Sequence, residues 1–283
     1  MSAQHKPAPA ADHQPKTYQR WNRQHRLQHF FLFMSMFGLM LSGLAIKFHK
    51  LAWAQLMFRL TGGFHNNLLL HKASATLLIG VSAYHVGYLL IQWVRVRTGP
   101  KDWAMMPGPN DLRDAWHHVL YLMQIRKEPP QYDRYTYLEK FEYLSIIWGM
   151  VIMGGTGLAL WFPTTAASYV PRVFLDAFRI FHANEAVVAT IALVYGHFFT
   201  VHLNPGVFPS SSVWYNGKIS LEHMLEEHPV EYQRLVAKGE LPAMTYHEHK
   251  ITGWRRGLAA FEMLIYSAIF YYMLITFLPR VLA

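Results

Sequence analysis

The chain of 283 residues contains no cysteine and has little charge. Without cysteine it cannot form disulfides, thiolate zinc sites, iron–sulfur clusters or the covalent attachment of a c-type haem. Charged residues make up 15% of the chain, whereas a soluble domain usually has about 25%. Aromatic residues contribute 15% and the 18 glycines follow no period, which excludes a disordered or collagen-like chain. Histidine is abundant instead, with 17 residues, several of them inside apolar blocks.

Five blocks are long and apolar enough to cross a bilayer, for which a helix needs roughly 20 residues. They are residues 27–46, 73–94, 143–162, 178–201 and 258–278. A soluble helical bundle is the alternative, but five such blocks would leave a soluble fold with little polar surface. The predicted fold class is therefore an all-α integral membrane protein, a four-helix bundle followed by a fifth transmembrane helix.

The distribution of Lys and Arg predicts the orientation of the chain. If the N-terminus is cytoplasmic, the cytoplasmic segments hold 19 Lys and Arg and the opposite side holds 6. Because basic residues accumulate in cytoplasmic loops, we expect the N-terminus inside and the C-terminus outside. The net charge of +9 is thus interpreted as topology and contact with membrane lipid, and no nucleic acid is expected as a partner.

The boundaries follow from the same apolar blocks. We expect a disordered tail over residues 1–20, the four-helix bundle over 21–205, an inner segment with a surface helix over 206–255 and the fifth helix over 256–283. Within the inner segments, surface helices are expected near residues 111–125 and over 220–238, and the outer loops are expected to be short.

Four histidines lie at two matched depths. The second block region carries His71 and His85, and the fourth carries His182 and His197. At about 100° per residue, separations of fourteen and fifteen residues keep each pair on one broad helix face, about 21–23 Å apart along the axis. Since the two helices are antiparallel, His71 comes level with His182 near the outer side, and His85 with His197 deeper inside. Two bis-His haems stacked across a membrane require this arrangement.

A less specific interpretation is that these histidines bond neighbouring helices or relay protons. Four of them at two matched depths favour haem iron as the metal they bind, because polar groups inside a bilayer are expensive and usually functional.

The inner level has further candidates. His29, near the start of the first block, reaches about the same depth as His85 and His197, and His202 lies about 7 Å further in than His197. Either one of His85 and His29 is the inner haem ligand and the other serves a quinone, or a third haem uses His29 with His202. The sequence leaves these alternatives open.

Other residues near the histidines have candidate roles. Arg179 and Lys72 flank the outer pair and are candidates for holding haem propionates, although snorkelling to lipid headgroups explains them equally well. His25, His29 and His202 place polar groups together near the inner side, which we interpret as a quinone site.

Several motifs resemble the cytochrome b subunits of respiratory membrane oxidoreductases, of the formate dehydrogenase gamma and thiosulfate reductase type. The resemblance covers about residues 20–205. Its motifs are Arg26-Leu27-Gln28-His29-Phe30 with Leu41-Ser42-Gly43-Leu44, Leu70-His71, His182, and His197-Phe198-Phe199. A related similarity to bacterial cytochrome b domains includes Leu138-Glu139-Lys140-Phe141-Glu142-Tyr143, Trp148-Gly149, Val201-His202, Asn204-Pro205 and Glu227-His228-Pro229-Val230-Glu231-Tyr232.

The resemblance implies ligands for two b-type haems. In the formate dehydrogenase type, the outer haem takes its ligands from spans two and four, which implies His71 and His182. The inner haem takes them from spans one and four, which implies His29 and His197. In the cytochrome b of quinol–cytochrome c reductases, paired spacing on two helices is the rule, which favours His85. Two or three haems are consistent with these patterns.

The expected function is electron transfer by a subunit of a quinone-linked oxidoreductase complex. The sequence has no glycine-rich flavin or nicotinamide fingerprint, so partners would supply the chemistry at either end. We expect a multi-pass protein of the bacterial inner membrane that exchanges electrons between quinone and a periplasmic cytochrome c, iron–sulfur or molybdenum subunit. The rival hypotheses are a proton-coupled transporter that uses intramembrane His and Glu, and a membrane anchor whose haems are structural.

Overall fold

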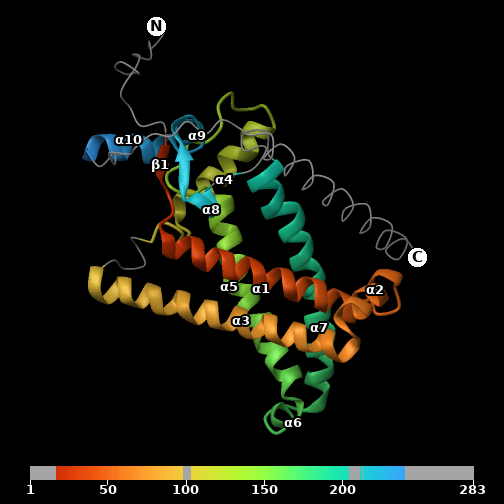
Figure 1. Ribbon diagram of the computed structural model, residues 1–283. Coiled ribbons are helices and arrows are strands. Elements are labelled where there is room, and N and C mark those ends of the chain that lie inside the picture. Colours follow the sequence, from red (N-terminus) through yellow and green to blue (C-terminus); the bar gives the residue numbers. More distant parts are fainter. Residues whose placement is uncertain (1–16, 98–102, 204–210, 212, 240–283) are drawn as a thin grey trace.

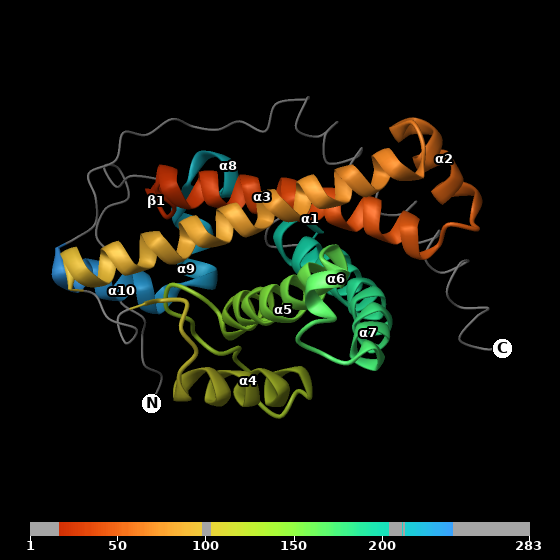
Figure 2. The same cartoon turned by 90° about the horizontal axis from the view of Figure 1, so that it is seen from below.

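A computed structural model describes residues 17–97, 103–203, 211 and 213–239. Its main elements are two helical hairpins. The first consists of α1 (Arg23–Lys47) and α3 (Phe64–Ile91), joined by the short helix α2 (Ala52–Thr61). The second consists of α5 (Tyr137–Trp161) and α7 (Arg172–Ile191), joined by the single turn α6 (Pro163–Ala166). The two hairpins cross each other rather than lying side by side along their length (Figures 1 and 2).

Four helices in the described residues are long and apolar enough to cross a membrane. They are Arg23–Lys47, Phe64–Val96, Tyr137–Trp161 and Arg172–His202, because α3 continues as the π-helical η1 (Gln92–Val96), and α7 continues as η3 (Ala192–His197) and η4 (Phe199–Leu203). The first four predicted spans are thereby confirmed, each beginning several residues earlier than predicted. The predicted fifth span, 258–278, lies outside the described residues.

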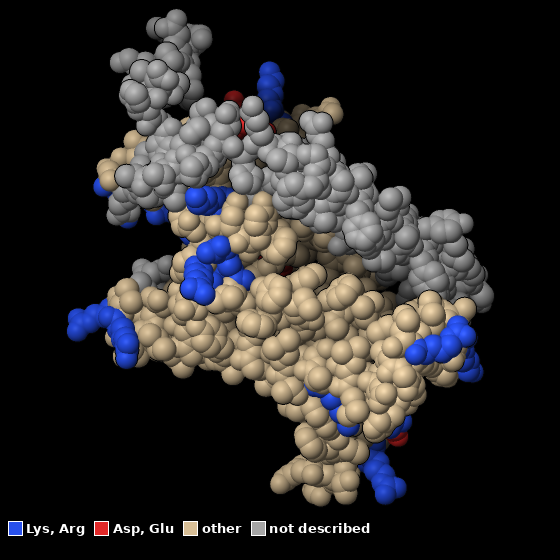
Figure 3. All heavy atoms as spheres, viewed as in Figure 1, with Lys and Arg blue, Asp and Glu red and all other residues tan. Residues whose placement is uncertain are grey.

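The side chains of these helices face outward. Only six apolar residues are buried in the part of the chain that the structure describes, and the most apolar window of α5 buries none of its residues. Figure 3 shows that the long flank of the α1–α3 hairpin is largely free of charge, with Lys and Arg gathered toward its ends. Such a surface suits lipid, because an apolar face of this extent is rare on a soluble protein.

Local signals explain where the helices begin and turn. Asn22 caps α1 by accepting a hydrogen bond from the backbone N–H of His25 at 2.9 Å. Thr136 and Glu139 form a capping box at the start of α5. Between α2 and α3 the chain turns at Gly62 and Gly63, whose φ angles of +83° and +117° favour glycine. Helix α2 was expected only as part of a short loop, because its ten residues are too few to stand out as a span.

A small polar unit sits at the end of the molecule where α1 begins. Strand β1 (Thr17–Gln19) pairs antiparallel with β2 (Lys218–Ser220), followed by α9 (Leu221–Glu227) and α10 (Pro229–Lys238). The short helix α8 (Val213–Asn216) packs against α1, and α4 (Pro109–Leu122) lies beside α5. Residues 17–20 were predicted as part of a disordered tail, but Tyr18 instead packs with Ile219 and Met224 in a buried apolar cluster.

A buried ion cluster holds this unit together. Glu231 is 2% exposed and binds Arg20 at 3.0 Å and Arg134 at 2.7 Å. Each arginine also donates to the backbone carbonyl of the other. The helix expected over 220–238 is divided into α9 and α10, because Pro229 cannot donate the hydrogen bond that a continuous helix needs at that position.

Candidate functional site

The first imidazole pair joins the two hairpins. His71 on α3 and His182 on α7 have ring centroids 6.4 Å apart and ring planes at 77°. An imidazole nitrogen lies about 2 Å from a bound metal and about 1 Å from its own ring centroid, so two imidazoles on opposite sides of one metal have centroids about 6 Å apart. The spacing of the first pair therefore fits two axial ligands of one iron.

Hydroxyl groups fix the tautomer of both rings in this pair. The Ser42 hydroxyl lies 3.0 Å from Nδ1 of His71, and the Thr156 hydroxyl lies 3.0 Å from Nδ1 of His182. Each hydroxyl donates its own proton to the carbonyl four residues earlier on its helix. It can therefore only accept from the imidazole, so Nδ1 bears the proton and Nε2 presents a lone pair. Ligating histidines usually have their second nitrogen bound in this way.

Two glycines leave room for these rings. A Cβ on Gly43 would lie 2.9 Å from Cε1 of His71, and a Cβ on Gly157 would lie 3.0 Å from Cε1 of His182. Both distances are shorter than an ordinary van der Waals contact, so a larger residue would move the imidazole. Glycine at positions 43 and 157 thus allows each imidazole of the first pair to keep its position.

The second pair consists of His29 on α1 and His197 at the end of η3. Their ring centroids are 6.2 Å apart, with planes at 50°. The Glu142 carboxylate accepts from Nδ1 of His197 at 2.8 Å, which again directs Nε2 of that ring away. The Trp21 indole packs edge-on against His29 at 5.2 Å. Among the described residues, Nδ1 of His29 is buried without a hydrogen-bond partner.

Helix α7 with its extension supplies one ring to each pair. His182 and His197 are fifteen residues apart, about 22 Å along a helix. Fifteen steps overshoot a common face by about 60°, but η3 is π-helical and so rotates less per residue. Such π-helical turns occur often at functional sites. They allow His182 and His197 to face their different partners from one continuous helix.

His85 does not meet His197 in the structure. Its Nδ1 lies 2.7 Å from Oε1 of Gln28 and its Nε2 lies 2.8 Å from the Tyr143 hydroxyl. Both ring nitrogens are therefore engaged, and neither presents a lone pair to a metal. Of the two alternatives for the inner level, the geometry brings together His29 and His197.

The residues predicted as quinone contacts lie near α1 and the end of α7. His25 packs edge-on against Tyr88 at 5.7 Å, and its Nδ1 is buried without a partner in the described residues. His202 stacks on Phe198 at 4.1 Å. His25 and His29 thus lie one turn apart on α1.

The two residues predicted to hold propionates make other contacts. Lys72 lies over the Trp161 ring at 5.3 Å. Arg179 lies 3.5 Å from Asp176, and both of these side chains are more than 70% exposed. These contacts leave both cations at the surface beside the first pair.

Sequence reasoning missed the residues that orient the rings. Ser42, Thr156 and Glu142 bind the Nδ1 atoms, and Gln28 and Tyr143 bind His85. Ser42 and Glu142 occur within motifs used for the family resemblance, which was the only available signal. Serine and threonine are common on transmembrane helices, so the types of Ser42 and Thr156 alone do not reveal this role.

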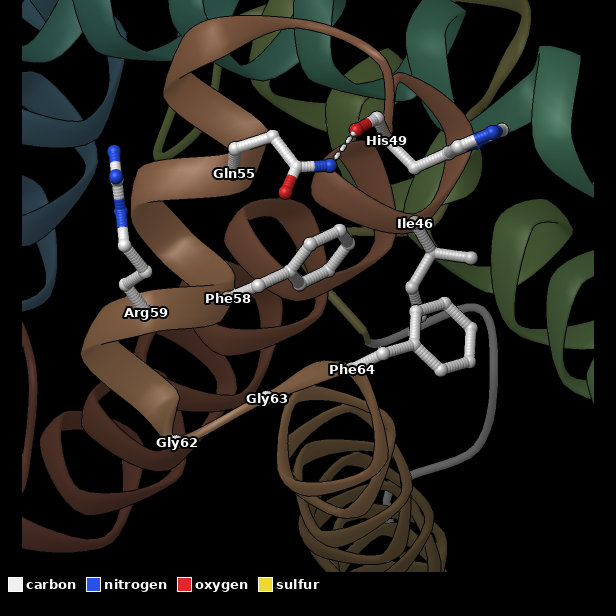
Figure 4. Close-up of a pocket in the computed structure, with 8 residues that line it drawn as sticks. All are labelled: Ile46, His49, Gln55, Phe58, Arg59, Gly62, Gly63 and Phe64. Carbon is white, nitrogen blue, oxygen red and sulfur yellow. Dashed lines mark hydrogen bonds between the residues drawn. The ribbon is translucent and has the colours of Figure 1, made fainter.

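A cavity of about 860 Å³ opens at the other end of the first hairpin, between the end of α1, α2 and the start of α3. Figure 4 shows the Phe58, Phe64 and Ile46 side chains gathered beside it. Its remaining lining residues are His49, Gln55, Arg59, Gly62 and Gly63. None of the four paired histidines lines this cavity, so it is a feature separate from the imidazole pairs.

A family comparison agrees with this geometry. The family model described as prokaryotic cytochrome b561 matches residues 20–210. The chain belongs to the prokaryotic cytochrome b561 family. Members of this cytochrome b family are all-helical membrane bundles that bind haem, and the chain is accordingly a multi-pass bacterial membrane protein of b-type haem electron transfer. A comparison with curated proteins finds no significant match.

The residues at both pairs fit such a b-type haem. Each site offers two imidazoles at the right spacing, and a haem needs no further protein ligand to its iron.

Proposed function

We propose that this cytochrome holds two b-type haems and transfers electrons across the bilayer between the quinone pool and a periplasmic redox partner. The observation that supports the proposal is the presence of two imidazole pairs, each at the spacing of axial ligands, about 22 Å apart along one helix. The pairs would lie near opposite faces of the hydrocarbon layer, which is about 30 Å thick.

We assign His71 and His182 to one haem and His29 and His197 to the other. The His29–His197 spacing and the engaged ring nitrogens of His85 support this choice over His85. It agrees with the pattern of the formate dehydrogenase type. A third haem on His202 receives no support, because its proposed partner His29 already faces His197.

The haems would supply one-electron redox couples inside an apolar layer. The residues of the chain would hold the haems and set their midpoint potentials. Ser42, Thr156 and Glu142 bind the Nδ1 atoms and so leave each Nε2 lone pair free to be donated to the iron, and the Glu142 carboxylate makes His197 the more basic ligand. Arg179 and Lys72 would meet propionates at the first pair.

The orientation is proposed from the distribution of Lys and Arg. With the N-terminus cytoplasmic, the first pair lies toward the periplasm and can exchange electrons with a cytochrome c, iron–sulfur or molybdenum subunit. The second pair lies toward the cytoplasm, and quinone would bind beside it near His25, His29 and His202. The chain then acts as the electron-transfer subunit of a quinone-linked oxidoreductase in the inner membrane.

The test is to count the haems of the purified protein by pyridine haemochrome and to titrate them with a quinol. We expect two b haems per chain with distinct midpoint potentials, both reduced by quinol. Three haems would return His202 to the ligand set. A colourless protein would favour a proton-coupled transporter, and haems that quinol does not reduce would favour a structural anchor.

A further inference from the structure

A second row of side chains runs beside the second imidazole pair. One row is His29, His197 and Glu142; the other is Gln28, His85 and Tyr143. The end residues of the two rows are neighbours in the sequence, because Gln28 precedes His29 on α1 and Tyr143 follows Glu142 on α5. The central residues come from different helices, His197 from η3 and His85 from α3. A group that binds at the Gln28 end would therefore lie one residue along α1 from His29 of the second pair.

Hydrogen bonds in the second row run in one direction. An amide oxygen only accepts, so Nδ1 of His85 bears the proton and donates to Oε1 of Gln28 at 2.7 Å. Nε2 of His85 then accepts from the Tyr143 hydroxyl at 2.8 Å. Because its oxygen is held by His85, the Gln28 amide is fixed with its NH₂ group turned away from that ring.

The row ends at a donor without a partner. Gln28 is 8% exposed, and its Nε2 atom is buried and reaches no hydrogen-bond acceptor in the described part of the chain. A buried donor left unpaired destabilises the folded chain, because it has lost its hydrogen bond to water. A side chain that is held this firmly by its oxygen and left open at its nitrogen indicates an acceptor supplied by a ligand.

The chemistry of the ligand follows from its surroundings. The free donor is a neutral amide, two turns or fewer from the start of a membrane-spanning helix, so it suits an uncharged oxygen of an amphipathic molecule. A propionate carboxylate would prefer a cation. Arg26, two residues earlier on α1, provides one: its Nη1 donates to the Tyr215 carbonyl at 2.8 Å and its Nε is buried without a partner in the described residues.

We propose that the Gln28 amide donates a hydrogen bond to a carbonyl oxygen of the quinone beside the second haem, with His85 and Tyr143 as positioning residues. This inference rests on the proposed function, and it adds Gln28 to a quinone site expected at His25, His29 and His202. His85, in this view, orients a quinone-binding amide instead of ligating iron.

The decisive variant is Gln28→Met, which keeps the length of the side chain and removes the donor. Its matched control is Gln24→Met, one turn earlier on α1, where the exposed Gln24 accepts from the Tyr84 hydroxyl at 2.7 Å. Binding of a fluorescent hydroxyquinoline N-oxide, a quinone analogue whose emission is quenched in the site, gives the dissociation constant without turnover. We expect a Kd about tenfold higher for Gln28→Met and unchanged for Gln24→Met.

The positioning residues are tested by Tyr143→Phe and His85→Ala, with Tyr84→Phe as the matched control. We expect Tyr143→Phe and His85→Ala to raise the Kd about threefold and the KM for quinol in parallel, with little change in kcat. Both variants should retain two b haems with unchanged midpoint potentials. A merely structural defect would lower haem content and kcat together.

Each outcome decides between the hypotheses. Loss of one haem in His85→Ala would make His85 a ligand and overturn the inference, as would an unchanged Kd in Gln28→Met. If the wild-type protein binds no quinone analogue and quinol does not reduce its haems, the proposed function is wrong as well. If the wild type binds and only the Gln28 effect is missing, the quinone linkage stands and the assigned contact is wrong.

Discussion

The two imidazole pairs have similar ring spacings but different surroundings. Around the first pair, each Nδ1 has a hydroxyl partner and each ring faces a glycine that leaves it room. Around the second pair, His197 is bound by a carboxylate, whereas Nδ1 of His29 has no partner in the described residues. Gln28 and His25 on the same turns of α1 also have buried nitrogens that reach no partner in the described residues.

The difference indicates a division of labour. The Nδ1 ring nitrogens of the first pair have hydrogen-bond partners on the neighbouring helices α1 and α5, as expected of a centre that only holds a cofactor. The second pair lies among donors that the described residues do not satisfy, as expected where a small polar molecule comes and goes. Comparing variants at the two pairs tests this division.

The largest effect is expected from removing a ligand. His71→Ala and His182→Ala should each reduce the haem content by one per chain and leave the spectrum of the second haem in place, because the four paired histidines are distinct and only α7 with its extension supplies one to each pair. Pyridine haemochrome analysis and redox titration measure both. His49→Ala, an exposed histidine, serves as the control. Loss of both haems from one of these variants would show that the two sites are not independent.

Crowding the first pair should have a smaller effect. A Cβ at Gly43 would lie 2.9 Å from the His71 ring, whereas a Cβ at Gly80 meets no atom within 4 Å. We expect Gly43→Ala to lower the occupancy of the first haem and Gly80→Ala to leave it unchanged. The measurement is haem content per chain after purification. Equal occupancy in the two variants would mean that Gly43 does not set the ring position.

Replacing the side chains that bind the Nδ1 atoms of the paired histidines should alter the midpoint potentials of the haems without loss of haem. Glu142→Gln removes a charge that increases the basicity of His197, so the midpoint potential of the second haem should rise, on the order of tens of mV. Thr156→Val should change only the potential of the first haem, and by less, since a hydroxyl is the weaker acceptor. A redox titration that shows both haems shifting in either variant would contradict the assignment of ligands.

The smallest effect concerns the polar unit at residues 213–238. Burial lowers the pKa of His228 to about 3, and the nearby Arg20 contributes. Between pH 6.5 and 3 the unfolded segment therefore binds a proton that the folded one excludes. Its stability should fall with pH below 6.5, by at most about 1.4 kcal/mol per pH unit.

Hydrogen exchange of the α9 and α10 amides at pH 7.5 and 5.5 measures this change. His228→Asn should weaken the pH dependence but not abolish it, because burial also lowers the pKa of His223. Protection factors, in which the pH dependence of the intrinsic exchange rate is divided out, that are equal at the two pH values in the native protein would contradict a neutral, buried His228.

Sequence patterns predicted the first four spans and the proximity of His71 to His182, but not which residue meets His197. Apolar runs reveal the spans directly, and residue counts give depth, which is enough where one candidate exists at each level. At the inner level His29 and His85 have similar depths. Which of them faces His197 depends on the rotation of α1 and α3, which residue counts do not determine.

Contacts between distant segments were also beyond the sequence. Arg20 and Glu231 are separated by 211 positions, so no local pattern connects them, and β1 is too short to be recognised without β2. This ion pair becomes buried only when the two distant segments pack against each other in the folded chain. Similarly, the hydroxyl partners of the first pair come from α1 and α5, whereas their imidazoles are on α3 and α7.

The crossing of the two hairpins has a consequence for biogenesis. Each hairpin is a local pair of neighbouring spans, which a translocon can deliver to the lipid by itself. Both ring pairs reach from one hairpin to the other, so porphyrin capture would lock the halves in register as the final event of maturation. Cells starved of haem should then accumulate inserted chains whose two hairpins lose contact with each other readily in mild detergent.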